Sequence, residues 1–540
     1  QLDLKRVREV LQKPFIDKAI SKIAHNAKFD LLMLNRFGFE IGPITFDTMI
    51  AEWLINPDSR NLGLKVMAWV KLGYEMTKIE TLIGKGKAQI TMDAVPISQA
   101  ARYAVADAVV TLRLYDILKV ELEKVNAQKL FDEIEMPLIP ILVEMERNGI
   151  SLDKEFFNKF SFELDTSLIE LEEKIFAFAG ENFNLNSTQQ LSDILFKRLG
   201  LQPPDSSRKT ASGFLSTAAG VLEDMSGQHE IIDLILDYRE LSKLKSTYVD
   251  ALPLQVNPET KRVHTSFNQT GTVTGRLASS DPNLQNIPTR TEIGRQVRYG
   301  FIANPGNLLL AVDYSQIELR IVAHIAQDKA MIDAFLKGQD IHATTAAAIN
   351  NIALEKVSKD QRRHAKAINF GLIYGMSAYG LTRSTDLTLA EAEKFVKDYF
   401  EHFPGVKNYL DSIRVLATEQ GYVETLLGRR RYFPNLKSGT NYNLRQREER
   451  EAINAPIQGS AADILKLAML RLPTALLNAK LTAKILLQVH DELILEVPEN
   501  ELNQTAVLVK EVLENAYKLD VPLTTEARSG VSWGELEKMD

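Results

Sequence analysis

A short apolar run that ends at a carboxylate and then changes period marks the middle of the chain. Residues 308–312 read Leu-Leu-Leu-Ala-Val, which indicates a buried strand. Asp313 follows directly, and from Ile317 to Ile325 the apolar positions recur at helical spacing. The pattern therefore predicts a strand, a carboxylate at its end and then a helix. A short Asp side chain suits a divalent cation, although an Asp at a strand end is more often a turn former or a helix cap.

A second pattern lies near the end of the chain, where two apolar runs flank a cluster of titratable side chains. Within residues 484–497 the runs surround His490, Asp491 and Glu492, which predicts a β-hairpin with an acidic tip. If this tip packs beside the strand that ends at Asp313, two carboxylates converge, and they repel each other unless a cation lies between them. Oxygen-only ligation favours Mg²⁺ completed by substrate phosphates. Two such ions about 3.5–4 Å apart would suit phosphoryl transfer.

A third pattern is a helix predicted over Gln361–Gly375. Arg362, Lys366, Phe370 and Tyr374 recur every four residues and therefore share one stripe of that helix. The cations at one end suit a triphosphate, and the aromatic rings at the other suit a sugar and a base. The same spacing equally fits an ordinary amphipathic helix with a solvated basic end and a buried aromatic end.

Helical patterns dominate the rest of the chain. A helix ends at Gly149 with an extended exit to Asp153, a long helix follows as far as Gly180, and another is predicted over His229–Leu252. The two long helices carry little chemistry and are interpreted as an arm. The basic segment Gly428–Arg450 is interpreted as a loop.

Composition and charge narrow the class of protein. The length of 540 residues favours about three or four domains. The formal net charge of −7 argues against a uniformly basic coat for nucleic acid but allows a local basic channel. The absence of cysteine excludes disulfides and thiolate metal sites, and no apolar run approaches the roughly 18 residues of a membrane helix. Because the chain begins with Gln1, we expect a fragment of a longer product, from a reducing cytoplasm.

These segments resemble the three polymerase motifs of the bacterial DNA polymerase I family (family A), and the chain resembles its large, Klenow-type fragment. They read DYSQIELR from Asp313, RRHAKAINFGLIYG from Arg362 and QVHDE from Gln488, and TGRLASSDPNLQNIP and INAPIQGSAADILK match as well. The resemblance implies an α+β multidomain, right-hand polymerase: a palm with an antiparallel sheet, and helical fingers and thumb. A truncated RNase H-like 3′-5′ exonuclease domain would precede it. The implied domains are an exonuclease-like part over residues 1–130, a connection over 131–153, a thumb over 154–252, palm over 253–338 and 458–540, and fingers over 339–457.

The same resemblance implies roles for individual residues. Those implied at the catalytic metal centre are the carboxylates of Asp313 and Asp491, the backbone of Tyr314 and the supporting acid Glu492. Those implied at the incoming nucleotide are Gln316, Glu318 as a steric gate against a 2′-hydroxyl, His342, Arg362, Lys366, Phe370 and Tyr374. Those implied in DNA contact are Lys243, Lys245, Arg276, Arg450, Asn454, Gln458 and His490. The resemblance also implies that the basic loop Gly428–Arg450 and the basic residues of the arm line a channel for duplex DNA. From the residues alone, Glu318 could be a helix-surface acid, and His490 could be a turn residue.

The N-terminal part departs from the family pattern. Asn26, Asp30, Tyr103 and Asp107 match the second and third motifs of the family's 3′-5′ exonuclease. The first motif, Asp-x-Glu, should lie well before Asp30, and none occurs in residues 1–25. Two of the acids that would hold the metal pair are therefore missing. We expect a vestigial exonuclease domain that serves as structural support, and the family's 5′ nuclease domain is absent from this sequence.

The function that follows is a template-directed DNA polymerase for replication and repair. It would take primer–template DNA and deoxynucleoside triphosphates, and it would use two Mg²⁺ ions, for which Mn²⁺ could substitute. We expect a monomer in the bacterial cytoplasm, associated with the nucleoid and not with a membrane. The alternative is a nucleic-acid-binding module whose polymerase centre is silent. A nuclease as the main activity is excluded, because the metal-binding acids of the Asp-x-Glu motif are missing.

Overall fold

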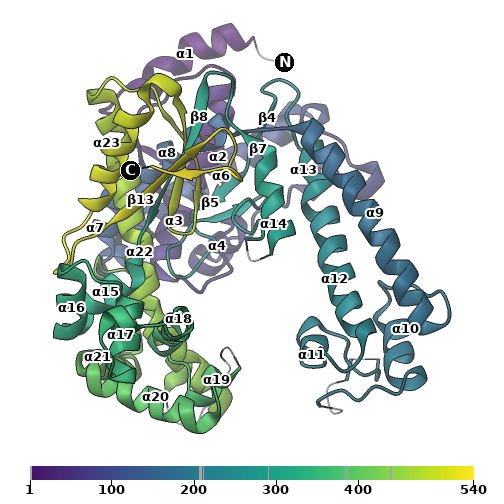
Figure 1. Cartoon of the computed structure of the whole chain (residues 1–540). Helices are drawn as coiled ribbons and strands as arrows, with labels where there is room; N and C mark the ends of the chain where they lie inside the picture. The colour runs from purple at the N-terminus through teal and green to yellow at the C-terminus, as the bar shows by residue number, and fades with distance from the viewer. Residues whose placement is uncertain are drawn as a thin grey trace.

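The computed structural model describes residues 3–205, 209–210, 212–289, 291–383, 385, 387–437 and 441–539. In this part of the chain the buried apolar side chains form three clusters. One lies around the central sheet and its helices, one in the N-terminal segment, and one at the tip of a helical arm. Figure 1 shows the arm of α9 and α12 on one side and the helices α15 to α21 on the other, with the sheet above them.

An antiparallel sheet forms the centre of the molecule, in the order β11–β12–β8–β13–β14. Its strands are β8 Asn307–Tyr314, β11 Lys484–Val489, β12 Glu492–Pro498, β13 Thr525–Gly530 and β14 Glu537–Lys538. The apolar run predicted as a buried strand is β8, whose residues 309–312 are fully enclosed. The predicted hairpin is β11–β12, and β12 pairs with β8 along its whole length. Both predictions are confirmed, and the sheet holds because its apolar strand residues pack against helices such as α23, Leu502–Glu514.

The segment that follows β8 folds into a helical lobe, drawn in green at the lower left of Figure 1. Its helices are α15 Ile317–Ala326, α16 Lys329–Leu336, α17 Ile341–Asn350, α18 Lys359–Ile373, α19 Ala378–Thr382, α20 Leu389–His402 and α21 Pro404–Gln420. The predicted helix with the basic and aromatic stripe is α18, which confirms that prediction. It begins with a capping box, because Ser358 and Gln361 exchange side-chain and backbone hydrogen bonds.

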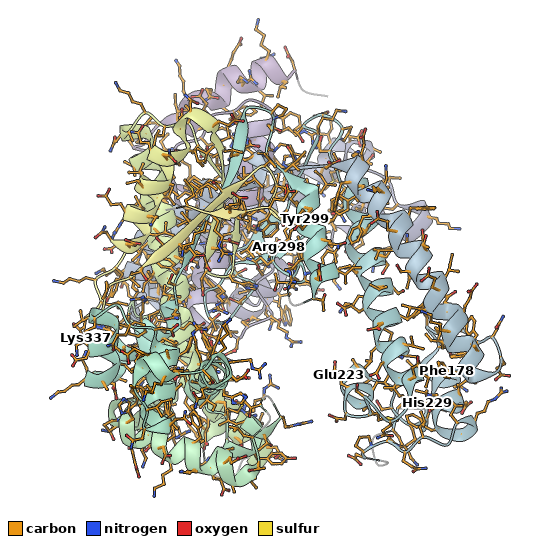
Figure 2. All side chains as sticks on the ribbon, in the orientation of Figure 1. Phe178, Glu223, His229, Arg298, Tyr299 and Lys337 are labelled. Atoms are coloured by element: carbon orange, nitrogen blue, oxygen red, sulfur yellow. The ribbon has the colours of Figure 1, made fainter. Side chains whose placement is uncertain are left out.

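The predicted arm is confirmed, with one change. Its helices are α9 Lys154–Ala179, α10 Thr188–Ser192, α11 Ala219–Glu223, α12 Glu230–Leu244 and α13 Ala251–Leu254. The single helix expected over His229–Leu252 is interrupted by the π-helical stretch Lys245–Val249. Figure 2 places Phe178, Glu223 and His229 at the far end of the arm, Arg298 and Tyr299 beside the central sheet, and Lys337 on the opposite lobe.

The N-terminal segment is built around a two-stranded parallel pair, β1 and β2. Its elements are α1 Leu4–Ile16, β1 Lys22–Ala24, α2 Ala27–Arg36, β2 Ile44–Asp47, α3 Thr48–Ile55, α4 Leu64–Leu72, α5 Glu80–Ile83 and α6 Ile97–Lys124. The exit into the palm consists of α7 Gln128–Leu130, a π-helical turn Phe131–Glu135, α8 Met136–Asn148 and β3 Ile150–Leu152. The helix predicted to end at Gly149 with an extended exit is therefore confirmed.

The remaining short elements connect these parts. They are β4 Arg262–Val263, β5 Ser266–Asn268, β6 Ala278–Ser280, α14 Glu292–Gln296, β7 Phe301–Ile302, β9 Tyr422–Glu424 and β10 Arg430–Tyr432. The long helix α22, Tyr442–Asn478, crosses the expected boundary between fingers and palm at residue 457, and the domain bounds stay predictions. No helix in the described residues is both long enough and apolar enough to cross a membrane.

The interpretation of Gly428–Arg450 as a loop is wrong for part of its length. Arg445, Arg447 and Arg450 lie in the first turns of α22. These turns lack a strong apolar stripe, and pairs four residues apart, such as Arg445 with Glu449 at 2.9 Å, support the helix instead. Arg429 does not line a channel either, because its side chain is buried.

Candidate active site

Three carboxylates meet at the end of the central sheet. Asp313 is the second-to-last residue of β8, where it pairs with Glu492 of β12. Asp491 lies in the two-residue turn of the hairpin, where His490 takes a left-handed conformation with φ of 56°. The Tyr314 backbone N–H donates to the Asp491 carbonyl at 3.3 Å, which ties the hairpin turn to the end of β8. The convergence expected from the sequence is therefore present.

The crowding of these acids changes their protonation. Loss of hydration and the nearby charge of Asp491 raise the pKa of Asp313 to about 6, although part of its surface stays exposed. Loss of hydration, with a further contribution from Asp313, raises the pKa of Glu492 to about 7. Burial also raises the pKa of Asp491, while Arg276 acts in the opposite direction. A cation bound between them would relieve this repulsion.

The donor set fits a cation that shares its ligands with a substrate. Among the described residues, no group of three or more His, Cys, Asp or Glu side chains forms a metal site by itself. Asp313 and Asp491 nevertheless offer oxygen ligands from the end of β8 and from the hairpin turn bonded to it, and Mg²⁺ is bound by one or two carboxylates together with water and phosphate oxygens.

Two charged residues next to the carboxylates, Arg298 and Glu526, were not identified from the sequence. Arg298 lies near Glu492, and its guanidinium stacks over the Trp533 ring at 4.1 Å. On β13, Glu526 is the register partner of Asp313 on the side opposite Glu492. These residues lie outside the polymerase motifs, and only the strand order of the sheet reveals that they adjoin the site.

Glu318 lies in the first turn of α15 and is bound from two sides. The Arg276 Nη2 donates to its carboxylate at 2.7 Å, and the Tyr374 hydroxyl donates to the other carboxylate oxygen. The side chain is largely buried, and burial raises the pKa of Glu318 although both donors act to lower it. Because α15 begins directly after β8, this carboxylate stands next to the acidic end of the sheet. Gln316, the residue before α15, has φ of 57° and forms the N-cap of that helix.

The stripe on α18 faces the same region. Lys366 is exposed, whereas Arg362 forms an ion pair with Asp340 at 2.6 Å. The ring of Phe370 lies 6.3 Å from the ring of Tyr374, which is the C-cap of the helix. The structure thus brings cations and aromatic rings along one face, as the spacing predicted.

His342 is an internal residue rather than an exposed one. Its side chain is buried, its Nδ1 lies 3.0 Å from the Asn369 amide nitrogen, and its ring lies 5.8 Å from the Phe370 ring. Burial lowers the pKa of His342 to about 4, so the ring is neutral at physiological pH. A direct contact of His342 with nucleotide stays a prediction, and in this structure it supports the aromatic end of α18.

Some of the residues expected to touch DNA have exposed side chains, and others are partly buried. Arg450, Lys243 and His490 are exposed overall. Partial loss of hydration of the His490 ring, together with the charges of Arg276 and Arg298, lowers the pKa of His490. Asn454 and Gln458 lie one turn apart on α22, and the Asn454 side-chain oxygen is buried without a hydrogen-bond partner among the described residues. Such an unpaired acceptor is available to a ligand.

Lys245 differs from the expectation. Its ammonium forms ion pairs with Asp250 at 2.8 Å and Asp165 at 3.3 Å, which pin the π-helical stretch to α9. Its role in this structure is to brace the arm, and of these two lysines Lys243 is the exposed one.

The residues of the exonuclease motifs occupy two helices of the N-terminal segment. Asn26 is the N-cap of α2, and Asp30 lies in that helix, where loss of hydration and the neighbouring Asp47 raise its pKa to about 6. Tyr103 and Asp107 lie on α6. Burial raises the pKa of Asp107, and the charge that acts on it is Lys65, which also lies 4.8 Å above the Tyr103 ring. The two motif carboxylates therefore have different electrostatic neighbours.

The palm sheet, the flanking helical lobes and the carboxylates at the strand end define the right-hand fold of nucleic-acid polymerases. More specifically, the chain belongs to DNA polymerase family A. The profile described as "DNA polymerase family A" matches residues 154–535, and the profile described as "3'-5' exonuclease" matches residues 1–123.

Individual relatives agree with that membership. The chain is 43% identical to DNA polymerase I of Rhizobium leguminosarum over 539 residues, which is 98% of this chain and 52% of the relative. It is 50% identical to thermostable DNA polymerase I of Thermus filiformis over 409 residues, 76% of this chain and 48% of the relative. The chain thus spans about half the length of these relatives.

A solved structure gives the same fold. It is the POL domain of Pol1 from M. smegmatis in complex with DNA primer-template and dNTP. The TM-score is 0.89 at 37% sequence identity, and the match covers 98% of this chain and 89% of that chain. The right-hand architecture with an exonuclease-like segment in front is therefore confirmed.

Proposed function

We propose that this chain is a template-directed DNA polymerase that extends a primer 3′ end with deoxynucleotides and releases pyrophosphate. The meeting of Asp313 and Asp491 at the end of the palm sheet carries this proposal, because phosphoryl transfer needs concentrated negative charge to hold divalent cations. Family membership supports it, as does the named complex of the M. smegmatis domain with primer-template and dNTP. The inferred role is DNA replication and repair.

The metal assignment is part of the same proposal. Asp313 and Asp491, with the backbone of Tyr314, would hold two Mg²⁺ ions, and Mn²⁺ could take their place. When bound, these ions would supply Lewis-acid activation of the primer hydroxyl and neutralise charge on the leaving phosphates. Glu492 would support the pair as a neighbouring acid whose proton occupancy changes near neutral pH.

The side chains around this centre would bind and orient the nucleotide. Lys366 is free to contact the triphosphate, whereas Arg362 would exchange Asp340 for a phosphate. Phe370 would pack on the sugar, and Gln316 lies at the turn between the strand and α15. Glu318 would fill the space that a ribose 2′-hydroxyl needs. Movement of α18 toward the palm would complete the site only around a matched base pair.

The duplex would pass between the arm and the helical lobe. The side chains inferred to contact it are Lys243, Arg276, Arg450, Asn454, Gln458 and His490, with Lys245 bracing the arm. The exonuclease-like segment would be silent in this chain, because Asp30 and Asp107 have different electrostatic neighbours and no Asp-x-Glu precedes them. A monomeric state and a location at the bacterial nucleoid stay predictions.

Primer extension tests the function directly. A labelled primer on a DNA template would be incubated with Mg²⁺ and all four deoxynucleotides, with the parent chain, Asp313→Asn, Asp491→Asn and the control Asp93→Asn. Asp93 is an exposed carboxylate in the N-terminal segment. We expect extension by the parent and the control, and none by the two palm variants. A folded parent that binds the duplex but does not extend it would instead identify a silent binding module.

A lane without nucleotides tests the exonuclease. We expect the primer to keep its length in this lane. Shortening of the primer by the parent, and not by Asp107→Ala, would show that the segment is an active exonuclease in spite of the missing motif.

A further inference from the structure

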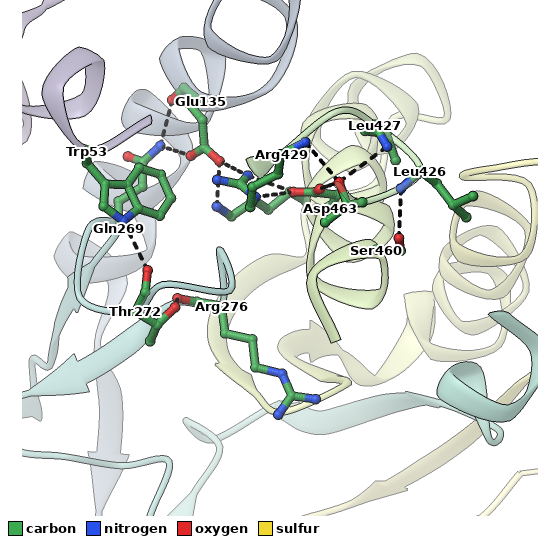
Figure 3. Close-up of polar contacts among 12 residues, drawn as sticks. Trp53, Glu135, Gln269, Thr272, Arg276, Leu426, Leu427, Arg429, Ser460 and Asp463 are labelled. Atoms are coloured by element: carbon green, nitrogen blue, oxygen red, sulfur yellow. Dashed lines mark hydrogen bonds and ion pairs between the residues drawn. The ribbon is translucent and has the colours of Figure 1, made fainter. Parts of the chain in front are cut away.

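Trp53 lies where the exonuclease-like segment meets the palm. It belongs to α3, its side chain is 1% exposed, and its indole Nε1 donates to the Thr272 backbone carbonyl at 3.0 Å. The Thr272 hydroxyl in turn donates to the Arg276 carbonyl at 2.7 Å. Figure 3 shows both contacts, with the Arg276 side chain directed away from the buried cluster. The backbone that carries Arg276 is therefore fastened to a residue of the N-terminal segment.

Arg429 holds the same turn from its other side. Gly275 has φ of +86°, and a Cβ at this position would lie 2.4 Å from the Arg429 Nε. The Arg429 side chain has no room to withdraw, because it is 4% exposed and pairs with Glu135 and with Asp463 at 2.6 Å. Turn 272–276 is thus packed against a buried ion pair on one side.

Trp53 and Arg429 also contact each other. The guanidinium carbon of Arg429 lies 4.9 Å from the centre of the Trp53 ring, and the Lys466 ammonium lies 5.3 Å from it. Gln269, which precedes the turn, donates to the Glu135 carboxylate at 2.5 Å. The indole is therefore fixed in position by charged groups of the palm and cannot swing away from Thr272.

The free end of this turn reaches the nucleotide site. Arg276 donates to Glu318 at 2.7 Å, and Glu318 also accepts the Tyr374 hydroxyl. The Arg276 side chain is one-third exposed, so its ion pair with Glu318 competes with water and depends on how well its backbone is held. A continuous set of contacts thus runs from Trp53 through Thr272 and Arg276 to Glu318.

We propose that Trp53 is a positioning residue for sugar selection, which holds Arg276 against Glu318 through the Thr272 carbonyl. This inference rests on the proposed polymerase function and deepens it. It gives the exonuclease-like segment a task that requires no exonuclease chemistry. Without the indole donor, one end of the turn is released, the Arg276–Glu318 ion pair is populated less, and the carboxylate that excludes a 2′-hydroxyl becomes mobile. The acids at Asp313 and Asp491 are untouched, so chemistry on deoxynucleotides continues.

The test measures discrimination between deoxyribo- and ribonucleotides. Trp53→Phe keeps most of the ring and removes the N–H donor, and Trp69→Phe is the matched control, since Trp69 lies in the same segment with 61% of its side chain exposed. For each protein, kcat/KM would be measured for dATP and for ATP on one primer–template. The sugar ratio is kcat/KM for dATP divided by kcat/KM for ATP. We expect this ratio to fall roughly fivefold in Trp53→Phe, the equivalent of one lost hydrogen bond, and to stay at the parent value in Trp69→Phe.

A double variant separates positioning from a general loss of stability. If Trp53 acts through Glu318, then Trp53→Phe changes the sugar ratio in the parent but leaves it unchanged in a Glu318→Ala background. Gly275→Ala, which pushes the turn away from Arg429, should lower the ratio in the same direction. An equal effect of Trp53→Phe in both backgrounds, or a ratio identical to that of the Trp69→Phe control, overturns the inference while leaving the polymerase intact. A parent that extends no primer removes the proposed function, and the inference with it.

Discussion

The Tyr374 hydroxyl donates a hydrogen bond to the Glu318 carboxylate and thereby links α18 to the first turn of α15. Arg276 occupies the other carboxylate oxygen at 2.7 Å. A carboxylate held by two donors from different parts of the chain has a defined position. It also lies in the first turn of the helix that follows β8, so its position bears on what can lie beside Asp313.

Glu318→Ala should weaken sugar selection. Removing this side chain opens the space that a 2′-hydroxyl would need, so we expect use of ribonucleotides to rise on the order of tenfold or more. The measurement is kcat/KM for a ribonucleotide against the matching deoxynucleotide. Glu318→Gln is the control, because it keeps the size of the side chain while its amide oxygen can accept only one of the two hydrogen bonds, and it should retain most of the selectivity. Unchanged selectivity in the Ala variant would remove Glu318 as the gate.

Lys366→Ala should impair nucleotide use much more than duplex binding. The exposed ammonium on α18 has a triphosphate as its proposed partner, and a charge-assisted contact of this kind is worth about 1.5–3 kcal/mol, or roughly 10- to 100-fold in KM. Steady-state kinetics would give KM for the nucleotide, and a titration of labelled primer–template would give Kd for DNA. The control is Lys397→Ala on α20, where the ammonium lies 3.8 Å from Glu401. Equal losses in nucleotide and duplex affinity would contradict this assignment.

The acidic end of the sheet should make metal-free stability depend on pH. Asp313 and Glu492 have pKa values raised from their usual 3.8 and 4.5 to about 6 and about 7. The folded state therefore favours the protonated carboxyl groups. Their contribution to the free energy of unfolding is fully present below about pH 4 and is lost as pH rises through 6 to 7. In chelator, Asp313→Asn should be more stable than the parent at about pH 8, with the difference vanishing near pH 4.

Mg²⁺ should reverse that order. A cation that binds only the folded state stabilises it, so the parent should gain thermal stability on addition of Mg²⁺ and Asp313→Asn should gain little. Thermal unfolding with and without Mg²⁺ would measure both effects, beside the control Asp93→Asn. If the Asn variant is no more stable than the parent at about pH 8 in chelator, the carboxylates do not repel each other as the structure indicates.

Local patterns predicted the catalytic elements well. The apolar run predicted β8, the two runs around His490 predicted the β11–β12 hairpin, and the four-residue spacing predicted α18. Each of these depends on residues close together in sequence, which is where periodicity and turn chemistry are informative. The family motifs then supplied roles, such as that of Glu318, which no pattern of polarity could give.

Long-range pairing was beyond the same reasoning. Arg429 reads as one cation of a basic run, yet its partners Glu135 and Asp463 lie 294 and 34 residues away. Trp53 and Thr272 are 219 residues apart. Nothing in the local sequence distinguishes a buried, paired arginine from an exposed one. The interpretation of Gly428–Arg450 as a loop failed for a related reason, because the start of α22 is held by charge pairs rather than by an apolar stripe.

Glu135 should be among the most costly single residues to remove. Its carboxylate is fully enclosed and pairs with Arg429 and with Lys466 at 2.8 Å. Burial alone would raise the pKa of Glu135, but these two cations lower it to about 2, so its contribution to folding is present above about pH 4.5 and is lost only in strong acid. Glu135→Ala leaves two buried cations with one remaining anion, and we expect a loss of about 3–5 kcal/mol in the free energy of unfolding.

Glu133→Ala is the matched control for this loss. Glu133 precedes Glu135 in the same π-helical turn and is 63% exposed, and its carboxylate lies 3.9 Å from the Lys129 ammonium. Its removal should therefore change the free energy of unfolding by less than about 0.5 kcal/mol. Urea denaturation of both variants and the parent would measure the difference. Because Glu135 anchors the cations that pack on Trp53, its loss should also lower the sugar ratio, whereas Glu133→Ala should not. A Glu135→Ala protein as stable as the control would show that water, and not Glu135, satisfies Arg429 and Lys466.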